Sequence, residues 1–291
     1  MSELAKIAAK LLKKEGMNST SLPQVNLYYS ENTTQRAPLL YKQGIIFILQ
    51  GEKTIYSGSE TYTYNPTNFI TLTVPLPLEC QAISNDGQPI IGLTMDIEMP
   101  VLNRLIHQME ESETISRVDR GEKDRGFFIG QLKSEIKNSL KRLLLCLQDP
   151  IQSKILGNDR VKELLFHVLR HEQSSALYAL AMKNTGISKI DTALRDIQLN
   201  YQKTFDVEGL AGSVNMSPSS FHQTFKRVTA SSPIQYVKKV RLVKAKEILS
   251  SECQTVSEVA SSVGYESVSQ FNREFKRYFG LTPGSLKRVT I

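Results

Sequence analysis

Two short segments near the C-terminal end carry side chains of the types that recognise the edges of nucleic-acid bases. Asparagine and glutamine can pair with adenine, arginine with guanine and serine with several edges, while valine can touch the methyl group of thymine. Spacings of three and four positions place such side chains together on one face of a helix. They are Ser219, His222 and Gln223 in the first segment and Val268, Ser269, Asn272 and Arg273 in the second.

The two segments belong to an internal repeat in which residues 207–239 recur as residues 256–288. Each copy is typical of a short helix, a turn and a second helix, which together form a helix-turn-helix unit. The matches before the turn lie 49 positions apart and those after it 50, so one residue is inserted there: Leu210, Ala211 and Val214 match Val259, Ala260 and Val263, whereas Phe221, Phe225, Lys226, Arg227 and Pro233 match Phe271, Phe275, Lys276, Arg277 and Pro283.

The residue types at the turns fit this interpretation. Asn215 and Gly264 are the types that best tolerate a left-handed backbone. Ser217 and Ser267 can cap the second helices by accepting hydrogen bonds from exposed backbone amides. We expect six residues at the ends of these helices to hold DNA phosphates: Ser217, Lys226, Arg227, Ser267, Lys276 and Arg277.

A continuous helix is predicted between the two units, over residues 234–249. At about 1.5 Å per residue it would span roughly 24 Å. Successive major grooves on one face of DNA recur about every 34 Å, so two tilted helices at the ends of this rod could enter both. Bending of the duplex is one way for both helices to enter.

The basic charge is concentrated in the same region. The chain has a net charge of +7, and residues 187–291 contain 15 Lys and Arg against 9 Asp and Glu. Nucleic-acid binding needs basic residues where phosphates lie. A solvated basic surface without a partner is the alternative explanation of the charge. Two aligned helix-turn-helix copies favour DNA over a plain helical bundle.

The N-terminal part predicts a different architecture, so the expected fold class is α+β. Short apolar runs from residue 25 to 98, separated by Gly, Pro, Asn and Asp, are typical of an antiparallel β-barrel or jelly roll. Helices are expected over residues 100–183, interrupted by a polar loop at 112–126. We predict a regulatory domain at 1–183, a linker at 184–189 and a DNA-binding domain at 190–291.

A stripe of apolar residues within 127–147 allows two interpretations. Leu132, Ile136, Leu140, Leu143 and Leu147 follow each other at steps of four, four, three and four. This spacing is nearly that of a coiled-coil seam and would suit a dimerisation helix. An amphipathic helix that packs on its own domain shows the same stripe.

The C-terminal region, residues 187–291, resembles the AraC/XylS family of transcription regulators. The most specific part is ASSVGYESVSQFNREFKRYFGLTP, residues 260–283, which is similar to the family signature around its second helix-turn-helix. The resemblance implies base-facing roles for the seven residues named first. Two positions in the first unit differ: Ala230 stands where the family usually has glycine, and Ser219 is smaller than the usual residue.

Residues 39–109 resemble more loosely the β-barrel sensory domain of one branch of this family, through LLYKQGIIFILQGEKTIYSGSETYTYNPTNFITLTVPLPLE. The resemblance implies a cupin-like barrel that senses a small molecule. Tyr56, Tyr62 and Tyr64 are the candidate effector-binding residues, although Tyr62 and Tyr64 could equally point to solvent. Alternatively, this domain only dimerises or docks a regulatory protein.

Enzyme functions are weaker alternatives. A metal-dependent cupin enzyme would hold its metal through barrel histidines, but His107, His167, His171 and His222 all lie outside the strand segment. A fused DNA-repair alkyltransferase would need more cysteines for a zinc site than the single Cys80 of the strand region. We therefore expect no catalysis, no cofactor and no metal.

The remaining expectations concern surroundings and partners. Cys80, Cys146 and Cys253 are far apart and suggest no disulfide framework, which fits a reducing cytoplasm. No apolar stretch is long enough to span a bilayer, so no membrane partner is expected. The expected partners are promoter DNA, a small-molecule effector, a second copy of the chain in a homodimer, and RNA polymerase.

Overall fold

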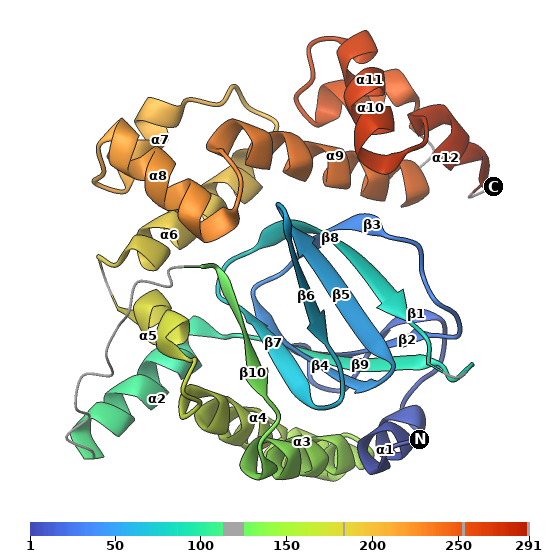
Figure 1. Cartoon of the computed structure of the whole chain (residues 1–291), viewed down its shortest axis with the longest axis vertical. Coiled ribbons are helices and arrows are strands. Elements are labelled where there is room, and N and C mark those ends of the chain that lie inside the picture. The colour runs from blue at the N-terminus through green and yellow to red at the C-terminus, as the bar shows by residue number, and fades with distance from the viewer. Residues whose placement is uncertain (86, 113–124, 183, 252–253, 290–291) are drawn as a thin grey trace.

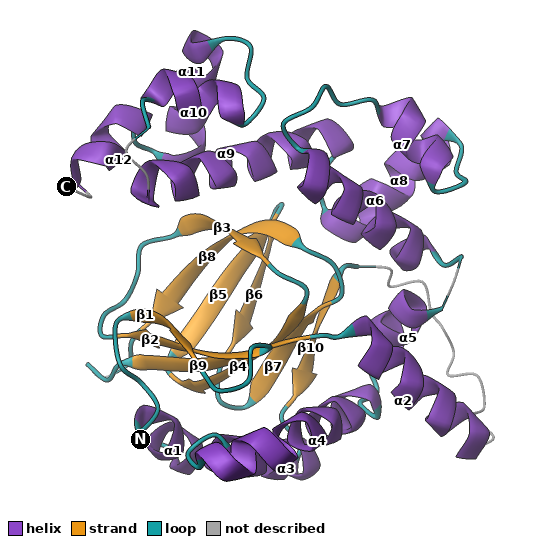
Figure 2. Cartoon of the chain, turned by 180° about the vertical axis from the view of Figure 1, so that it is seen from behind, coloured by secondary structure: helices purple, strands orange, loops and turns teal. Residues whose placement is uncertain are grey.

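The chain folds into three layers: N-terminal helices, two packed β-sheets, and a C-terminal helical region. The computed structural model describes residues 1–85, 87–112, 125–182, 184–251 and 254–289. In Figures 1 and 2 the two sheets lie between α1, α3 and α4 on one side and α6 to α12 on the other. None of the helices in these ranges combines the length and apolar character that crossing a bilayer requires.

The predicted antiparallel strands form two sheets. Sheet A has the order β1-β2-β9-β4-β7-β10 and sheet B the order β3-β8-β5-β6, and every paired neighbour is antiparallel. Their interiors face each other across a shared apolar core. The strands are β1 (Gly16–Ser19), β2 (Val25–Ser30), β3 (Ala37–Tyr41), β4 (Gly44–Gln50), β5 (Glu52–Ser57), β6 (Glu60–Tyr64), β7 (Asn68–Leu72), β8 (Leu76–Ile83), β9 (Ile90–Asp96) and β10 (Phe127–Gln131).

The N-terminal helices are α1 (Glu3–Ala9), α2 (Met99–Ser112), α3 (Ser134–Cys146), α4 (Pro150–Leu169) and α5 (Ser175–Ala181). Of these, α1 contacts β4 and β9 of sheet A and packs on α3, α3 packs on α4, and α2 packs on α4 and α5. The helix predicted from residue 127 begins at Ser134, because residues 127–131 pair with β7 as strand β10. Most of the polar loop predicted at 112–126 lies outside the described residues.

The apolar stripe of α3 is used inside the chain. Ile136, Leu140, Leu143 and Leu147 are all buried, and α3 packs on α1 and α4. Of the two interpretations of this stripe, the structure therefore supports a helix that packs on its own domain. A coiled-coil seam would have left these side chains exposed.

The C-terminal region contains two short helix pairs joined by one long helix. Helix α6 begins at Gly186, within the predicted linker. Helix α9 places Tyr236, Val237 and Val240 in the core shared with the sheets and the first pair, and Leu242, Ala245 and Leu249 in a separate core under the second pair. The helices are α6 (Gly186–Asn200), α7 (Val207–Ser213), α8 (Pro218–Thr229), α9 (Pro233–Ser251), α10 (Val256–Ser262), α11 (Val268–Phe279) and α12 (Pro283–Val289).

The local chemistry of both turns is as predicted. Asn215 and Gly264 adopt φ angles of 54° and 87°, and the hydroxyls of Ser217 and Ser267 accept hydrogen bonds from the backbone amides of the helices they cap. A β-carbon at Gly264 would lie 2.4 Å from the carbonyl oxygen of Gln202. Glycine is therefore required there for close approach as well as for its backbone angle.

The two recognition-type helices, α8 and α11, end in the same left-handed conformation with different residues. Helix α8 ends at Ala230 with φ 53°, and α11 ends at Gly280 with φ 75°. An L-residue in this conformation costs about 1–2 kcal/mol that glycine does not. The departure of Ala230 from the family pattern therefore places strain in the first unit only.

Reciprocal substitutions at these two caps test this point. Ala230→Gly should raise the free energy of unfolding by about 1 kcal/mol, and Gly280→Ala should lower it by about 1 kcal/mol. Urea denaturation followed by circular dichroism measures both variants. If the free energy of unfolding changes in the same direction in both variants, the left-handed backbone is not the cause of the difference between the two caps.

Candidate nucleic-acid interface

The seven residues predicted to read bases lie on the exposed faces of α8 and α11. Each of these side chains is exposed, although the C-terminal region is packed on the sheets. On the opposite faces, Phe221 and Phe225 of α8 and Phe271 and Phe275 of α11 are fully buried. Both helices therefore anchor one aromatic face in a core and leave the other in solvent: the exposed residues are Ser219, His222, Gln223, Val268, Ser269, Asn272 and Arg273.

Aromatic packing holds the two units in equivalent ways. The ring centroids of Phe221 and Phe225 lie 5.4 Å apart, and those of Phe271 and Phe275 lie 5.5 Å apart. In the first unit the ring of Tyr236 on α9 meets Phe225 edge-on at 5.5 Å. Such pairs contribute stability beyond the area they bury. The repeat thus reproduces a packing arrangement as well as a sequence.

The residues predicted to hold phosphates are also exposed. Lys226, Arg227, Lys276 and Arg277 all lie in the last turns of their helices and are exposed. Basic side chains there also interact favourably with the helix dipole. The hydroxyls of Ser217 and Ser267 already accept hydrogen bonds from Ser220 and Gln270 amides, so they can still donate to a phosphate oxygen.

Arg241 fixes the second unit on the long helix, a role that the sequence analysis missed. Its guanidinium donates to the carbonyl oxygens of Tyr201 at 2.7 Å, Gly264 at 2.8 Å and Lys203 at 2.8 Å. One side chain thereby joins α9, the turn of the second unit and the segment after α6. The only signal for this role in the sequence is that Arg241 stands among the apolar residues of the predicted long helix.

Glu274 makes a second connection between α9 and α11. Lys238 donates to one of its carboxylate oxygens at 2.8 Å and Tyr265 donates to the other at 2.9 Å. Burial acts to raise the pKa of Glu274, but hydrogen bonds from Lys238, Tyr265 and Gln270 hold it below its usual value. The carboxylate is therefore ionised, and each of its oxygens accepts a hydrogen bond. These bonds orient α11 on α9.

The first unit of the C-terminal region also makes hydrogen bonds to the segments that precede β8 and β10. The buried Tyr236 hydroxyl donates to the Pro75 carbonyl at 2.9 Å, and the Gly126 amide donates to the Val228 carbonyl at the end of α8 at 2.9 Å. We call this contact the docking interface.

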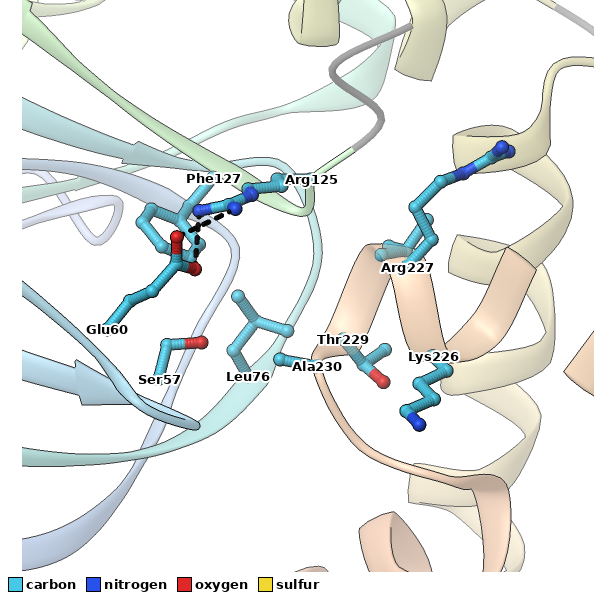
Figure 3. A pocket seen from close by; sticks show the side chains of 10 residues that line it. Ser57, Glu60, Leu76, Arg125, Phe127, Lys226, Arg227, Thr229 and Ala230 are labelled. Atoms are coloured by element: carbon cyan, nitrogen blue, oxygen red, sulfur yellow. Dashed lines mark hydrogen bonds and ion pairs between the residues drawn. The ribbon is translucent and has the colours of Figure 1, made fainter. Parts of the chain in front are cut away.

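A pocket of about 400 Å³ lies beside the docking interface. Figure 3 shows Ser57, Glu60 and Arg125 on the sheet side and the end of α8 on the other, with Glu60 and Arg125 paired. Lys226 and Arg227 line this pocket as well as belonging to the predicted DNA surface. The C-terminal end of α8 thus belongs both to this pocket and to the predicted DNA surface.

The three tyrosines proposed as effector-binding residues do not lie together. Tyr62 and Tyr64 share one face of β6, but Tyr56 points to the other face of its neighbour β5. Tyr64 is fully buried and lies 3.2 Å from the hydroxyl of Tyr41. Tyr62 donates to Glu60, and Tyr56 lies under the guanidinium of Arg36.

No metal site accompanies these features in the described part of the chain, where no group of three or more His, Cys, Asp or Glu side chains could hold an ion. Cys80 and Cys146 are free thiols, and Cys253 lies outside the described residues.

Comparison with known proteins covers both parts of the chain. A family model for the N-terminus of AraC-type transcriptional regulators matches residues 21–176, and a helix-turn-helix domain model matches residues 210–288. The virulence regulon transcriptional activator VirF of Yersinia enterocolitica is 21% identical over 251 residues, which cover 86% of this chain and 90% of VirF.

Two further proteins are similar to this chain. The RCS-specific HTH-type transcriptional activator RclR of Escherichia coli is 42% identical over 81 residues, or 28% of each chain. The structure of ToxT from Vibrio cholerae with a bound unsaturated fatty acid superimposes with a TM-score of 0.62 at 14% identity, covering 94% of this chain and 97% of ToxT. This likeness shows that the two proteins share a fold.

The Arg241 contacts can be tested by substitution. Arg241→Met should lower the free energy of unfolding by about 3 kcal/mol, because three carbonyls lose a charged donor, and should weaken DNA binding because the second unit loses its fixed position. Lys244→Met is the control on the same helix, where an exposed pair with Glu247 is lost at a cost of about 0.5 kcal/mol or less. Equal effects in denaturation and gel-shift assays would contradict the assigned role.

Proposed function

Because this chain belongs to the family of AraC-type transcriptional regulators, we propose that it reads promoter DNA with α8 and α11 together. It is a DNA-binding transcription regulator with an AraC-type N-terminal domain, as the matches over both regions show. The observation that carries the proposal is that both helices present their polar faces to solvent from the ends of one helix, α9.

The proposed division of labour follows the position of each side chain on its helix. The seven exposed residues nearer the helix starts read bases, with Arg273 and Asn272 as the strongest candidates for guanine and adenine. Lys226, Arg227, Lys276 and Arg277, with the capping serines, hold phosphates and set the register on the duplex. With about 1.5 Å per residue, the 19 residues of α9 separate the two units by roughly 28 Å.

We infer that the two sheets form the cupin-like sensory domain expected from the sequence. The two facing antiparallel sheets and their shared core support this inference. The fatty acid in the ToxT structure suggests a small organic effector for this chain too. A domain used only for dimerisation or for a regulatory protein is the alternative, and it would require no ligand in the sheet interior.

Control of DNA binding would then act through the docking interface. In the docked arrangement the end of α8 lies on the sheets, and Lys226 and Arg227 line the pocket beside it. An effector that binds the docked and undocked arrangements differently would shift the balance between them. We propose that undocking gives the first unit the freedom to fit DNA alongside the second.

A homodimer is proposed through the outer face of α3 and α4. Ile151 and Ile155 lie four residues apart on α4 and are 71% and 68% exposed, and Leu145 of α3 is 45% exposed. Exposed apolar side chains that cluster in this way favour a protein partner over solvent. A second copy of the chain would cover them on the side away from the DNA-binding helices (Figure 1).

The remaining proposals follow from the family. The relatives are transcription regulators, which supports a non-catalytic role in the cytoplasm and contact with RNA polymerase at promoters.

Selection of bound duplexes from a random pool tests DNA reading. The wild-type chain should enrich two motifs about 10 base pairs apart. Arg273→Ala should cost about 1–3 kcal/mol and relax preference at one base position, whereas Lys276→Ala should weaken all sequences alike and flatten the salt dependence. Lys154→Ala, on α4, is the matched charge control. Unchanged selectivity in Arg273→Ala would refute its assignment.

Two substitutions at separate points test the docking interface. Tyr236→Phe removes the hydrogen bond to Pro75, and the β-carbon of Gly126→Ala would lie 2.8 Å from the Val228 carbonyl oxygen. If docking restrains the first unit, each should increase DNA affinity by about fivefold, equivalent to roughly 1 kcal/mol. Fluorescence anisotropy with operator DNA measures this, and unchanged or reduced affinity in both variants would refute the restraint.

A further inference from the structure

Gln270 is a polar residue near the start of α11 that does not belong to the seven base-reading candidates. It precedes Arg273 by three positions and Glu274 by four, and residues at both spacings lie beside it on a helix. Arg273 is exposed, whereas only 12% of the Glu274 side chain is. Gln270 itself is half-buried. It therefore lies at the border between the outward face of α11 and the face that packs on α9.

The side-chain amide of Gln270 is bound to a carboxylate that is itself fixed. Its Nε2 donates to Oε1 of Glu274 at 3.2 Å. The same carboxylate oxygen accepts a hydrogen bond from Lys238 at 2.8 Å, and the other oxygen accepts one from the Tyr265 hydroxyl at 2.9 Å. Lys238 belongs to α9 and Tyr265 to the turn before α11. Glu274 therefore gives Gln270 a partner whose position is set by the rest of the fold.

The charge of that carboxylate decides which way the amide of Gln270 points. Burial acts to raise the pKa of Glu274, but hydrogen bonds from Lys238, Tyr265 and Gln270 hold it below its usual value. An ionised carboxylate only accepts hydrogen bonds. The amide nitrogen of Gln270 must therefore face Glu274 and the amide oxygen must face away, because an inverted amide would bring two acceptors together.

The outward part of this amide retains one acceptor and one donor. Oε1 of Gln270 accepts no hydrogen bond from the residues that the structure describes, and it is not buried. Nε2 uses one of its two hydrogens on Glu274 and keeps the second. In the major groove adenine offers the matching groups, the N6 donor and the N7 acceptor, whereas guanine offers acceptors at both places. An amide fixed in this direction therefore suits adenine and disfavours guanine.

The first unit has no equivalent of this arrangement. The repeat matches Gln270 with Ser220 and Glu274 with Thr224. The hydroxyl of a serine turns to donate or to accept as its partner requires, and a threonine carries no charge that would fix its neighbour. A polar group held in one direction is therefore a property of α11 that α8 does not share.

We propose that Gln270 is a further base-reading residue of the second unit, selective for adenine, and that Glu274 is the positioning residue that gives it this selectivity. The inference rests on the proposed function, because it requires α11 to lie in the major groove. It adds a second base assignment beside that of Arg273 to guanine. It also gives the Glu274 carboxylate a role in selectivity besides its role in holding α11 on α9.

Selection of bound duplexes from a random pool tests the proposal with the full chain. Gln270→Met should reduce the preference for adenine at one position of the second motif by about tenfold and leave the other positions unchanged. Glu274→Gln should admit guanine at that same position, because the amide of Gln270 can then turn over. Gln152→Met is the matched control on α4, where the amide donates to Asp149 at 3.3 Å, and it should alter no base preference.

Lys238→Met separates the direction of the amide from the anchoring of the helix. It removes the ion pair between α9 and α11 and leaves the carboxylate of Glu274 beside Gln270. We expect weaker binding to all sequences alike, with the preference for adenine retained. A purely structural role of Glu274 would instead make Lys238→Met and Glu274→Gln change base preference in the same way.

Three results would overturn the proposal. They are full retention of the wild-type preferences in Gln270→Met, an equal loss of affinity for all sequences in that variant, and an unchanged preference for adenine over guanine in Glu274→Gln. In each case the wild-type chain still selects a motif through the second unit, so only this inference fails. A wild-type chain that selects no such motif refutes the proposed DNA reading itself.

Discussion

Helix α9 is the constraint on which the arrangement of the two DNA-reading units depends. Its first half lies in the core shared with the sheets and its second half in the core of the second unit. Because interiors are close-packed, a helix built into two cores cannot turn in one without disturbing the other. Arg241 and Glu274 add directional contacts that fix the second unit on this helix.

The two units differ in what surrounds them, although their sequences repeat. The first unit shares its core with the N-terminal domain and contacts it through Tyr236 and Val228. The second unit has a core of its own. A signal from the sheets therefore has a direct physical connection to the first unit through a shared core, whereas the second unit meets sheet B only where α11 contacts β3.

The sheet interior and the docking interface offer different chemistry to a ligand. Between the sheets, one unpaired ammonium faces tyrosine rings and hydroxyls. At the docking interface several charges already have partners, such as Arg125 with Glu60 and Arg36 with Glu79. Lys53 is buried with its ammonium over the ring of Tyr28, so its environment differs from that of the paired charges at the docking interface.

The sequence by itself determined the features that depend on local chemistry and repetition. The two helix-turn-helix units, their turns at Asn215 and Gly264, and the serine caps follow from short-range backbone preferences. The alternating apolar runs likewise predicted antiparallel strands. Only the tertiary structure decided that residues 127–131 form a strand, because that depends on pairing with β7. It also decided the contacts of Arg241, Tyr236 and Lys53, whose partners lie far away in the sequence and are brought to them only by packing.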